Sequence, residues 1–183
     1  FLSKFSNRTR YIITSVDELA NIGKPKKFLV GSVLVVAVPP KQTLDVLNDL
    51  KDIWNTDVTI TDTSSVKNHI KLNGASNIIL SHPIAGSDQS GISAANGDLF
   101  KNKKNVLCDP FNSKKGHFEK VDNFWKNALQ MRTSSMSVSE HDLIFAMTSH
   151  LPHLVSYALI DSIRLSNHDV DDNAGGGLKE FLR

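Results

Sequence analysis

The segment Ser81–Asp88, with the sequence SHPIAGSD, places one histidine directly after an apolar run. That run, Ile78–Leu80, is typical of a buried strand, and Pro83 and Gly86 predict an immediate turn after it. Ligands of open α/β sheets bind beyond the carboxyl ends of the strands, so His82 is well placed for chemistry, and its ring exchanges a proton near neutral pH. A strand-end histidine that only hydrogen-bonds to a loop carbonyl has the same local pattern.

A second cluster, Asp62–Lys67 with the sequence DTSSVK, ends another strand-like run, Val58–Asp62. We predict that Ser64 or Ser65 begins a helix here. The free N–H groups of a helix N-terminus suit a phosphate or a carboxylate. Ordinary N-capping by a serine accounts for the same residues, so both interpretations stay open.

Polar residues also interrupt a long apolar helix that we predict over about residues 140–164. Asp142, Ser149 and His153 share one face at 100° per residue, and His150 lies within reach of that face. Because an unpaired buried polar group costs roughly 1–3 kcal/mol, such residues need partners. The histidines either have hydrogen-bond partners at a domain boundary or belong to a zinc site. The donors for a metal-dependent hydrolase are then His141, Asp142, His150 and His153.

The segment Ala174–Arg183, with the sequence AGGGLKEFLR, combines three glycines with two cations. The glycines permit a sharp turn or a close backbone approach. Lys179 and Arg183 lie four residues apart and share a face on a helix, where Arg183 offers a bidentate fork to a carboxylate. A flexible loop before a solvated helix start is an equally simple interpretation.

The elements that position these clusters alternate between strands and helices. Strands are predicted at Val33–Val38, Val58–Asp62, Asn77–Ser81, Asn105–Cys108 and Met131–Met136. Helices are predicted from Thr43 to about Trp54, over residues 117–129, and over about residues 140–164 with a kink at Pro152. This order predicts a doubly wound parallel α/β domain over residues 1–137 and the start of an all-α domain over residues 138–183.

Composition favours an ordinary globular domain. The chain has 183 residues, of which 40% are hydrophobic and 22% charged, and its formal net charge is +2. The lysines are scattered, so we expect no nucleic-acid partner. Cys108 has no second cysteine for a disulfide, and we expect no apolar run long enough to span a membrane. We therefore expect a cytoplasmic protein.

A doubly wound nucleotide-binding domain opens with a G-x-G-x-x-G turn, and this sequence has none. We expect the natural protein to have a further N-terminal segment with that turn. The arginines of Asn7–Arg10 would favour a 2′-phosphate if they follow the second strand, but a basic surface loop has the same pattern.

Taken in order, these motifs resemble the prephenate dehydrogenase family, which includes arogenate and cyclohexadienyl dehydrogenases. The motifs, as they stand here, are Val35–Pro39, Thr61–Lys67, Ser81–Ser87, Asp98–Phe100, His141–Asp142, Thr148–His153 and Ala174–Gly177. The resemblance implies a Rossmann-like domain followed by a helical dimerisation domain. It also implies oxidative decarboxylation of prephenate or arogenate to 4-hydroxyphenylpyruvate or tyrosine, with NAD or NADP as hydride acceptor, in a homodimer.

The resemblance also implies a role for each candidate residue. His82 accepts the proton of the substrate's ring hydroxyl, and Ser65 orients His82 beside the nicotinamide. Val38 and Pro39 adjoin the cofactor together with Ser65. Substrate binding falls to Ser87, Asp88, His150, His153, Lys179 and Arg183. No metal is implied.

Two alternatives remain besides the dehydrogenase. One is a non-catalytic dimerising or regulatory relic of that family, and the other is the metal-dependent hydrolase. Within the dehydrogenase hypothesis, the choice of substrate between prephenate and arogenate stays open, as does the choice of cofactor between NAD and NADP.

Overall fold

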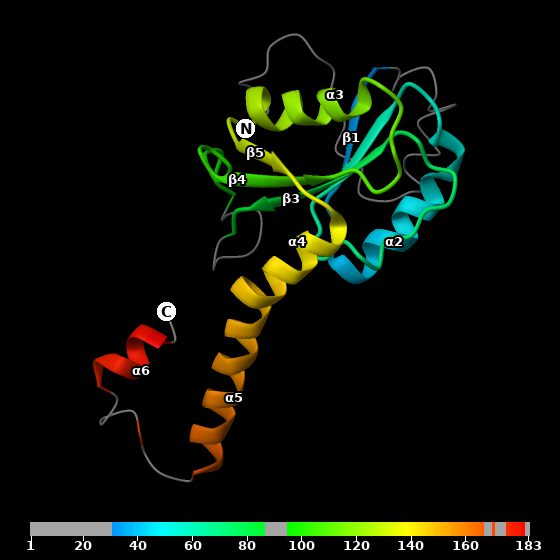
Figure 1. Cartoon of the computed structure of the whole chain (residues 1–183). Coiled ribbons are helices and arrows are strands. Elements are labelled where there is room, and N and C mark those ends of the chain that lie inside the picture. The colour runs from blue at the N-terminus through cyan, green and yellow to red at the C-terminus, as the bar shows by residue number, and fades with distance from the viewer. Residues whose placement is uncertain (1–30, 87–94, 167–169, 171–174, 182–183) are drawn as a thin grey trace. The chain divides into compact units, whose positions relative to one another are not determined.

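The computed structural model describes residues 31–86, 95–166, 170 and 175–181. The chain divides into two compact units, Phe1–His141 and Asp142–Arg183, and each is considered by itself. Figure 1 shows the elements of the first unit: β1 (Val33–Val36), α2 (Pro40–Asp49), β2 (Thr59–Asp62), β3 (Ile78–Ile84), β4 (Lys104–Cys108), α3 (His117–Asn123) and β5 (Arg132–Ser135). α4 (Val138–Phe145) begins in this unit and continues into the second.

The strands form one sheet in the order β1-β2-β3-β4-β5. Three neighbouring pairs are parallel, but β3 and β4 are antiparallel. The sheet is therefore mixed and mainly parallel, and the prediction of an all-parallel sheet is wrong at this one pair. A parallel neighbour needs a crossover, usually a helix, whereas the described part of the β3–β4 link, residues 85–86 and 95–103, contains no helix.

β3 runs straight through His82, so the turn predicted directly after this residue is wrong. β3 pairs with β2 only at Ile78 and Ile79, and within the described residues the rest of β3 pairs with β4 alone. Pro83 lies opposite Asn105 in this half. A proline lacks a backbone donor, and a stretch with a strand on one side only tolerates that loss.

The helix after β1 begins earlier than predicted. Pro40 occupies its first turn, where the missing N–H costs nothing, and Thr43 lies inside the helix rather than capping it. The Thr43 hydroxyl donates to the carbonyl of Pro39, 3.4 Å away. Leu47 is buried, and the helix tightens into a 3₁₀ turn over Leu50–Ile53 that buries both of its end residues.

The helix predicted to begin at Ser64 or Ser65 does not form, and residues 63–77 are irregular. Local side-chain bonds hold the chain instead. The Asp62 carboxylate accepts the backbone N–H of Ser64 at 3.0 Å, and the Ser64 hydroxyl donates to the carbonyl of Val66 at 3.1 Å. Such bonds offer the backbone an alternative to a helix.

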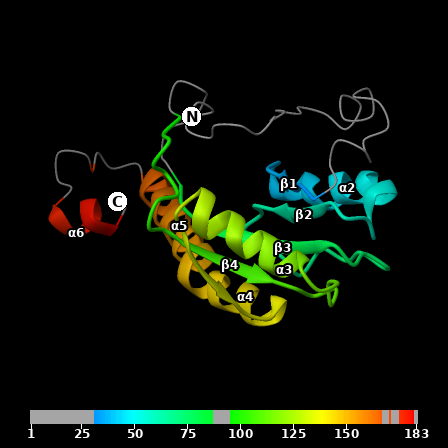
Figure 2. The same ribbon diagram turned by 90° about the horizontal axis from the view of Figure 1, so that it is seen from above.

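The core of this unit lies where α3 packs against the sheet (Figures 1 and 2). α3 continues into a π-helical turn, Phe124–Ala128, that carries the buried Trp125. The rings of Phe100 and Phe124 meet Trp125 edge-on. The buried cluster consists of Ile79, Leu107, Val121, Trp125 and Met131. This packing covers the face of β3 on which Ser81 lies. Because side chains alternate along a strand, His82 lies on the opposite face.

The second unit is helical. A π-helical turn over Ala146–His150 separates α4 from α5 (Leu151–Leu165), and α6 spans Gly176–Phe181. Pro152 sits in the first turn of α5, and the wide turn before it accommodates the missing donor.

The helical run Val138–Leu165 is 28 residues long and apolar enough to cross a membrane by length and composition, and only 6% of its most apolar window is buried. The prediction that no run reaches this length is therefore wrong. Its large exposed apolar side chains are Leu143, Ile144, Met147, Leu151, Leu154, Val155, Tyr157 and Leu165.

Candidate active site

His82 lies at the carboxyl edge of the parallel strands. β1 ends at Val36 opposite Asp62, the last residue of β2, whereas β3, parallel to both, continues past this level as far as Ile84, paired with β4. The backbone N–H of Ser81 donates to the Asp62 carboxylate at 2.9 Å, which aligns β3 with the end of β2. The half-buried His82 follows immediately. This is the edge at which open α/β sheets bind their ligands.

His82 contacts a second histidine, His141, at the start of α4. His82 Nδ1 and His141 Nε2 lie 2.9 Å apart, and the rings meet edge-on with centroids 5.0 Å apart. His141 is completely buried. From the sequence, His141 was expected as a ligand of a possible metal site and as part of a family motif, with no link to His82. No local signal could have paired two residues separated by 59 positions, because the pairing depends on the order of β3, β4 and β5.

A buried ion pair supports the backbone beneath His82. Lys67 Nζ lies 2.6 Å from the Asp62 carboxylate, and neither side chain is exposed. Lys67 Nζ also donates to the carbonyl of Ser81. Asp62 and Lys67 therefore hold the backbone N–H and the carbonyl of the residue that precedes His82. From the sequence, Lys67 was predicted only to end a motif.

The side chain of Ser81 joins a second set of buried groups. Its hydroxyl lies 2.6 Å from the Thr61 hydroxyl and accepts the indole N–H of Trp125 at 3.0 Å. Buried polar groups that are fully paired stiffen their surroundings. Ser81 is therefore fixed through both its backbone and its side chain.

The candidate cofactor residues lie at the same edge. Val38 and the exposed Pro39 form the turn between β1 and α2. Ser65 lies just beyond β2 and is partly exposed, and within the described residues its side chain makes no hydrogen bond. The orienting role for Ser65 toward His82 stays a prediction.

The substrate candidates are distributed differently. His150 lies in the π-helical turn of the second unit, and His153 stacks on Tyr157 with ring centroids 6.5 Å apart. Ser87, Asp88 and Arg183 fall outside the described residues, as does the side chain of Lys179, whose backbone belongs to α6. The structure thus groups His82, Ser65, Val38 and Pro39 on one sheet edge and leaves the substrate assignments as predictions.

The metal hypothesis receives no support from the described ranges, where no group of three or more His, Cys, Asp or Glu side chains is arranged to hold a metal ion. His141, which that hypothesis needs as a ligand, contacts His82 instead.

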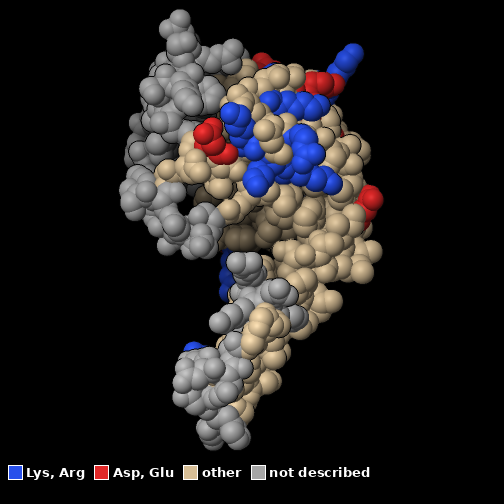
Figure 3. Space-filling model, turned by 90° about the vertical axis from the view of Figure 1, so that its left-hand side faces the viewer, with Lys and Arg blue, Asp and Glu red and all other residues tan. Residues whose placement is uncertain are grey.

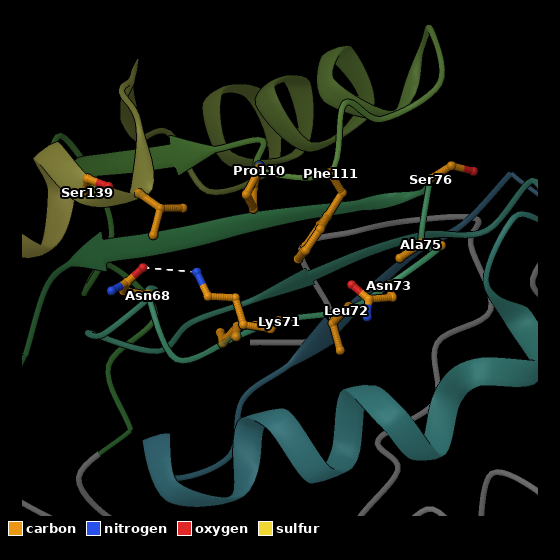
Figure 4. Close-up of a pocket in the computed structure, with 12 residues that line it drawn as sticks. Asn68, Lys71, Leu72, Asn73, Ala75, Ser76, Pro110, Phe111 and Ser139 are labelled. Carbon is orange, nitrogen blue, oxygen red and sulfur yellow. Dashed lines mark hydrogen bonds between the residues drawn. The ribbon is translucent and has the colours of Figure 1, made fainter.

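A separate cavity of about 590 Å³ lies between the loop 68–76, the turn at Pro110 and Phe111, and the start of α4 (Figure 4). Its polar lining includes Asn68, whose side-chain oxygen accepts a bond from Lys71 at 3.0 Å. None of the predicted site residues lines this cavity.

Basic side chains gather on one face of the molecule (Figure 3). At the starts of β4 and β5, Lys104 pairs in register with Arg132, and both are exposed. Exposed Lys101 and Lys103 precede β4. This local concentration was not expected from the scattered lysines, since it needs β4 and β5 side by side. The expectation of no nucleic-acid partner stays a prediction.

The fold and the site together define a class: a Rossmann-like nucleotide-binding domain followed by a helical domain. The family is more specific. Residues 7–131 match the nucleotide-binding domain of prephenate dehydrogenase, and residues 137–183 match the prephenate dehydrogenase dimerization domain. The chain belongs to the prephenate dehydrogenase family.

Individual relatives agree with this assignment. A cyclohexadienyl dehydrogenase from Zymomonas mobilis is 32% identical over 119 residues, which cover 58% of this chain and 38% of the relative. A prephenate dehydrogenase from Bacillus subtilis is 29% identical over 164 residues, which cover 84% of this chain and 44% of the relative. The chain therefore spans less than half the length of these curated relatives.

Solved structures show the same fold. The prephenate dehydrogenase from Aquifex aeolicus, crystallised with hydroxyphenyl propionate and NAD⁺, superposes with a TM-score of 0.76 at 27% identity, over 93% of this chain and 59% of that one. A Synechocystis arogenate dehydrogenase superposes with a TM-score of 0.69 at 22% identity, over 91% of this chain and 65% of that one, and supports the fold alone.

Proposed function

We propose that the protein to which this chain belongs oxidatively decarboxylates prephenate or arogenate, giving 4-hydroxyphenylpyruvate or tyrosine, with NAD or NADP as the oxidant. The observation that supports this most directly is a histidine at the carboxyl edge of a nucleotide-binding sheet, backed by a second buried histidine 2.9 Å away. Membership of the prephenate dehydrogenase family supplies the substrate class.

In this proposal His82 is the proton acceptor. It takes the proton of the substrate's ring hydroxyl while hydride leaves the carbon that bears this hydroxyl. The bond from the ring to its carboxylate then breaks, CO₂ departs, and the remaining electron pair completes the aromatic ring as a phenolate, which takes up a proton to give the product's hydroxyl. A positioned general base of this kind is typically worth about 10²–10⁴-fold in rate.

The described residues fit the reactive end of a dinucleotide cofactor. The exposed turn at Val38 and Pro39 opens at the same edge as His82, and Ser65 lies beyond the neighbouring strand. When bound, NAD or NADP supplies the hydride acceptor. The sequence has no G-x-G-x-x-G turn to cradle the phosphates, so the proposal assigns this chain no residue for that task.

Substrate binding is proposed for residues that the family motifs match. These are Ser87, Asp88, His150, His153, Lys179 and Arg183. Arg183 supplies a bidentate fork for a substrate carboxylate, and Lys179 a neighbouring positive charge.

We further propose that the helical unit pairs with a second copy of the chain. Its long helix exposes large apolar side chains, and the segment matches a dimerization domain. Such a patch marks either a protein or a membrane contact, and the family match favours the protein. A cytoplasmic location follows from this proposal.

The test is the variant His82→Asn in the complete natural protein, with the exposed His69→Asn as the matched control. An asparagine retains hydrogen-bonding groups but takes up no proton. We expect His82→Asn to lower kcat by about 10²–10⁴-fold with an unchanged circular dichroism spectrum, and His69→Asn to behave as wild type. Assays with both substrates and both cofactors decide between prephenate and arogenate and between NAD and NADP. Full activity of His82→Asn, or no reduction of nicotinamide with either substrate, contradicts the proposal.

A further inference from the structure

The contact between His82 and His141 requires one shared proton. His82 Nδ1 and His141 Nε2 are 2.9 Å apart, which is hydrogen-bond distance. Two bare ring nitrogens repel each other, and two N–H groups clash. One ring therefore donates and the other accepts, and the direction determines what His82 can do.

The two directions have opposite consequences at the other ring nitrogen of His82. If His141 donates, a neutral His82 has its proton on Nε2 and accepts no further proton there. If His82 donates through Nδ1, its Nε2 has a lone pair and can act as a base. The tautomer thus separates a base from a hydrogen-bond donor.

We propose that His141 is a positioning residue that holds His82 in the tautomer with the proton on Nδ1, leaving Nε2 as the base. The inference rests on the proposed function, which needs a proton acceptor at His82. It assigns to His141 the task that the buried aspartate performs in a Ser-His-Asp triad.

The surroundings of His141 suit an acceptor. The residue is completely buried and lies at the start of α4, where its own backbone N–H donates to the Ser137 carbonyl at 2.9 Å. A neutral imidazole has one bare ring nitrogen, and this nitrogen can accept a hydrogen bond. A neutral His141 presents a lone pair on the nitrogen that faces His82.

The same bond strengthens during the reaction. When His82 Nε2 takes the substrate proton, the ring becomes a cation whose Nδ1–H still donates to His141. Hydrogen bonds from charged donors are roughly twice as strong as neutral ones. Because this gain arises with the developing charge, loss of His141 should lower kcat more than it raises KM.

The kinetic test compares His141→Leu, which removes the acceptor, with His141→Gln, whose side-chain oxygen restores one, in the complete natural protein. We expect His141→Leu to lower kcat by about 10–100-fold with KM little changed, and His141→Gln to recover most of the loss. The exposed His69→Leu is the control for a histidine-to-leucine change. Unchanged kcat in a folded His141→Leu, or a loss confined to KM, overturns the inference.

A spectroscopic test reads the tautomer in the wild-type protein itself. Long-range ¹H–¹⁵N spectra of the histidine-labelled wild-type protein distinguish protonated from bare ring nitrogens. We expect His82 to have its proton on Nδ1, with the signal assigned by its loss in His82→Asn. A proton on Nε2 of His82 overturns the inference. If His82→Asn is inactive while His141→Leu is fully active, the proposed function stands and this inference alone fails.

Discussion

The two units of this chain differ in which side chains they bury and which they expose. In the sheet unit, strongly polar groups such as Asp62 and Lys67 are fully buried and paired around the backbone that leads to His82. In the helical unit, leucines that belong in a core are exposed, with Leu143 and Leu154 each 64% accessible. One unit buries charge and the other displays apolar surface.

This difference separates two tasks. The sheet unit positions the candidate base with its own residues, so that part of the site is preorganised within one chain. Within the described residues the apolar stripe of the helical unit is exposed, and burying such surface is worth about 25 cal/mol per Å². The proposed pairing with a second copy of the chain would bury it.

The largest expected effect comes from breaking the buried ion pair. Lys67→Met leaves the Asp62 carboxylate buried without its cation, and such a loss typically costs about 3–5 kcal/mol of unfolding free energy. The measurement is urea-induced unfolding of the complete natural protein.

The matched control is Lys126→Met, which breaks the exposed pair that Lys126 forms with Asp122 at 2.7 Å. Exposed helical pairs of this spacing are worth only about 0.3–0.5 kcal/mol. Equal effects of the two substitutions would show that the sheet unit does not depend on its buried charges.

The burial of Lys67 is an example of what local sequence patterns do not predict. The strand positions, the carboxyl-edge location of His82 and the long polar-interrupted helix follow from local patterns, because apolar runs and caps are short-range signals. The buried partners of Asp62 and His82 do not. They depend on which strands become neighbours, and no residue near Lys67 or His141 indicates that its side chain will be fully buried.

The direction of β4 was missed for a related reason. An apolar run predicts a strand but not its orientation, which depends on the link that precedes it. Pro83 misled in the same way: a proline predicts a turn unless one side of its strand has no neighbour, and this condition is a property of the assembled sheet.

The second prediction tests the exposed stripe. Leu143, Met147, Leu151 and Leu154 are spaced by four, four and three residues and share one helix face. Leu154→Glu places a charge in this stripe, and we expect it to weaken self-association by about 2 kcal/mol or more, as at the centre of a protein interface. Sedimentation equilibrium over a range of protein concentrations measures the effect.

Ser156→Glu is the control, since residue 156 lies on the opposite side of the helix from residue 154. It should leave the association constant unchanged. A monomeric wild type that floats with lipid vesicles would instead show that the apolar stripe faces a membrane.

The smallest expected effect concerns His117, which links α3 to β2 through a bond of 2.7 Å between its Nδ1 and the Thr59 hydroxyl. Burial lowers the pKa of His117 below its ordinary value of 6.5; nearby Lys120 and Lys114 lower it further, and Asp57 partly opposes them. Because the folded protein then binds a proton less readily than the unfolded chain, stability should decline as the pH falls below about 6.5. His117→Gln should reduce this decline in Tm between about pH 7.5 and 5.5, whereas the exposed His69→Gln should preserve it. An identical pH slope in His117→Gln would mean that the acid sensitivity of the sheet unit originates elsewhere.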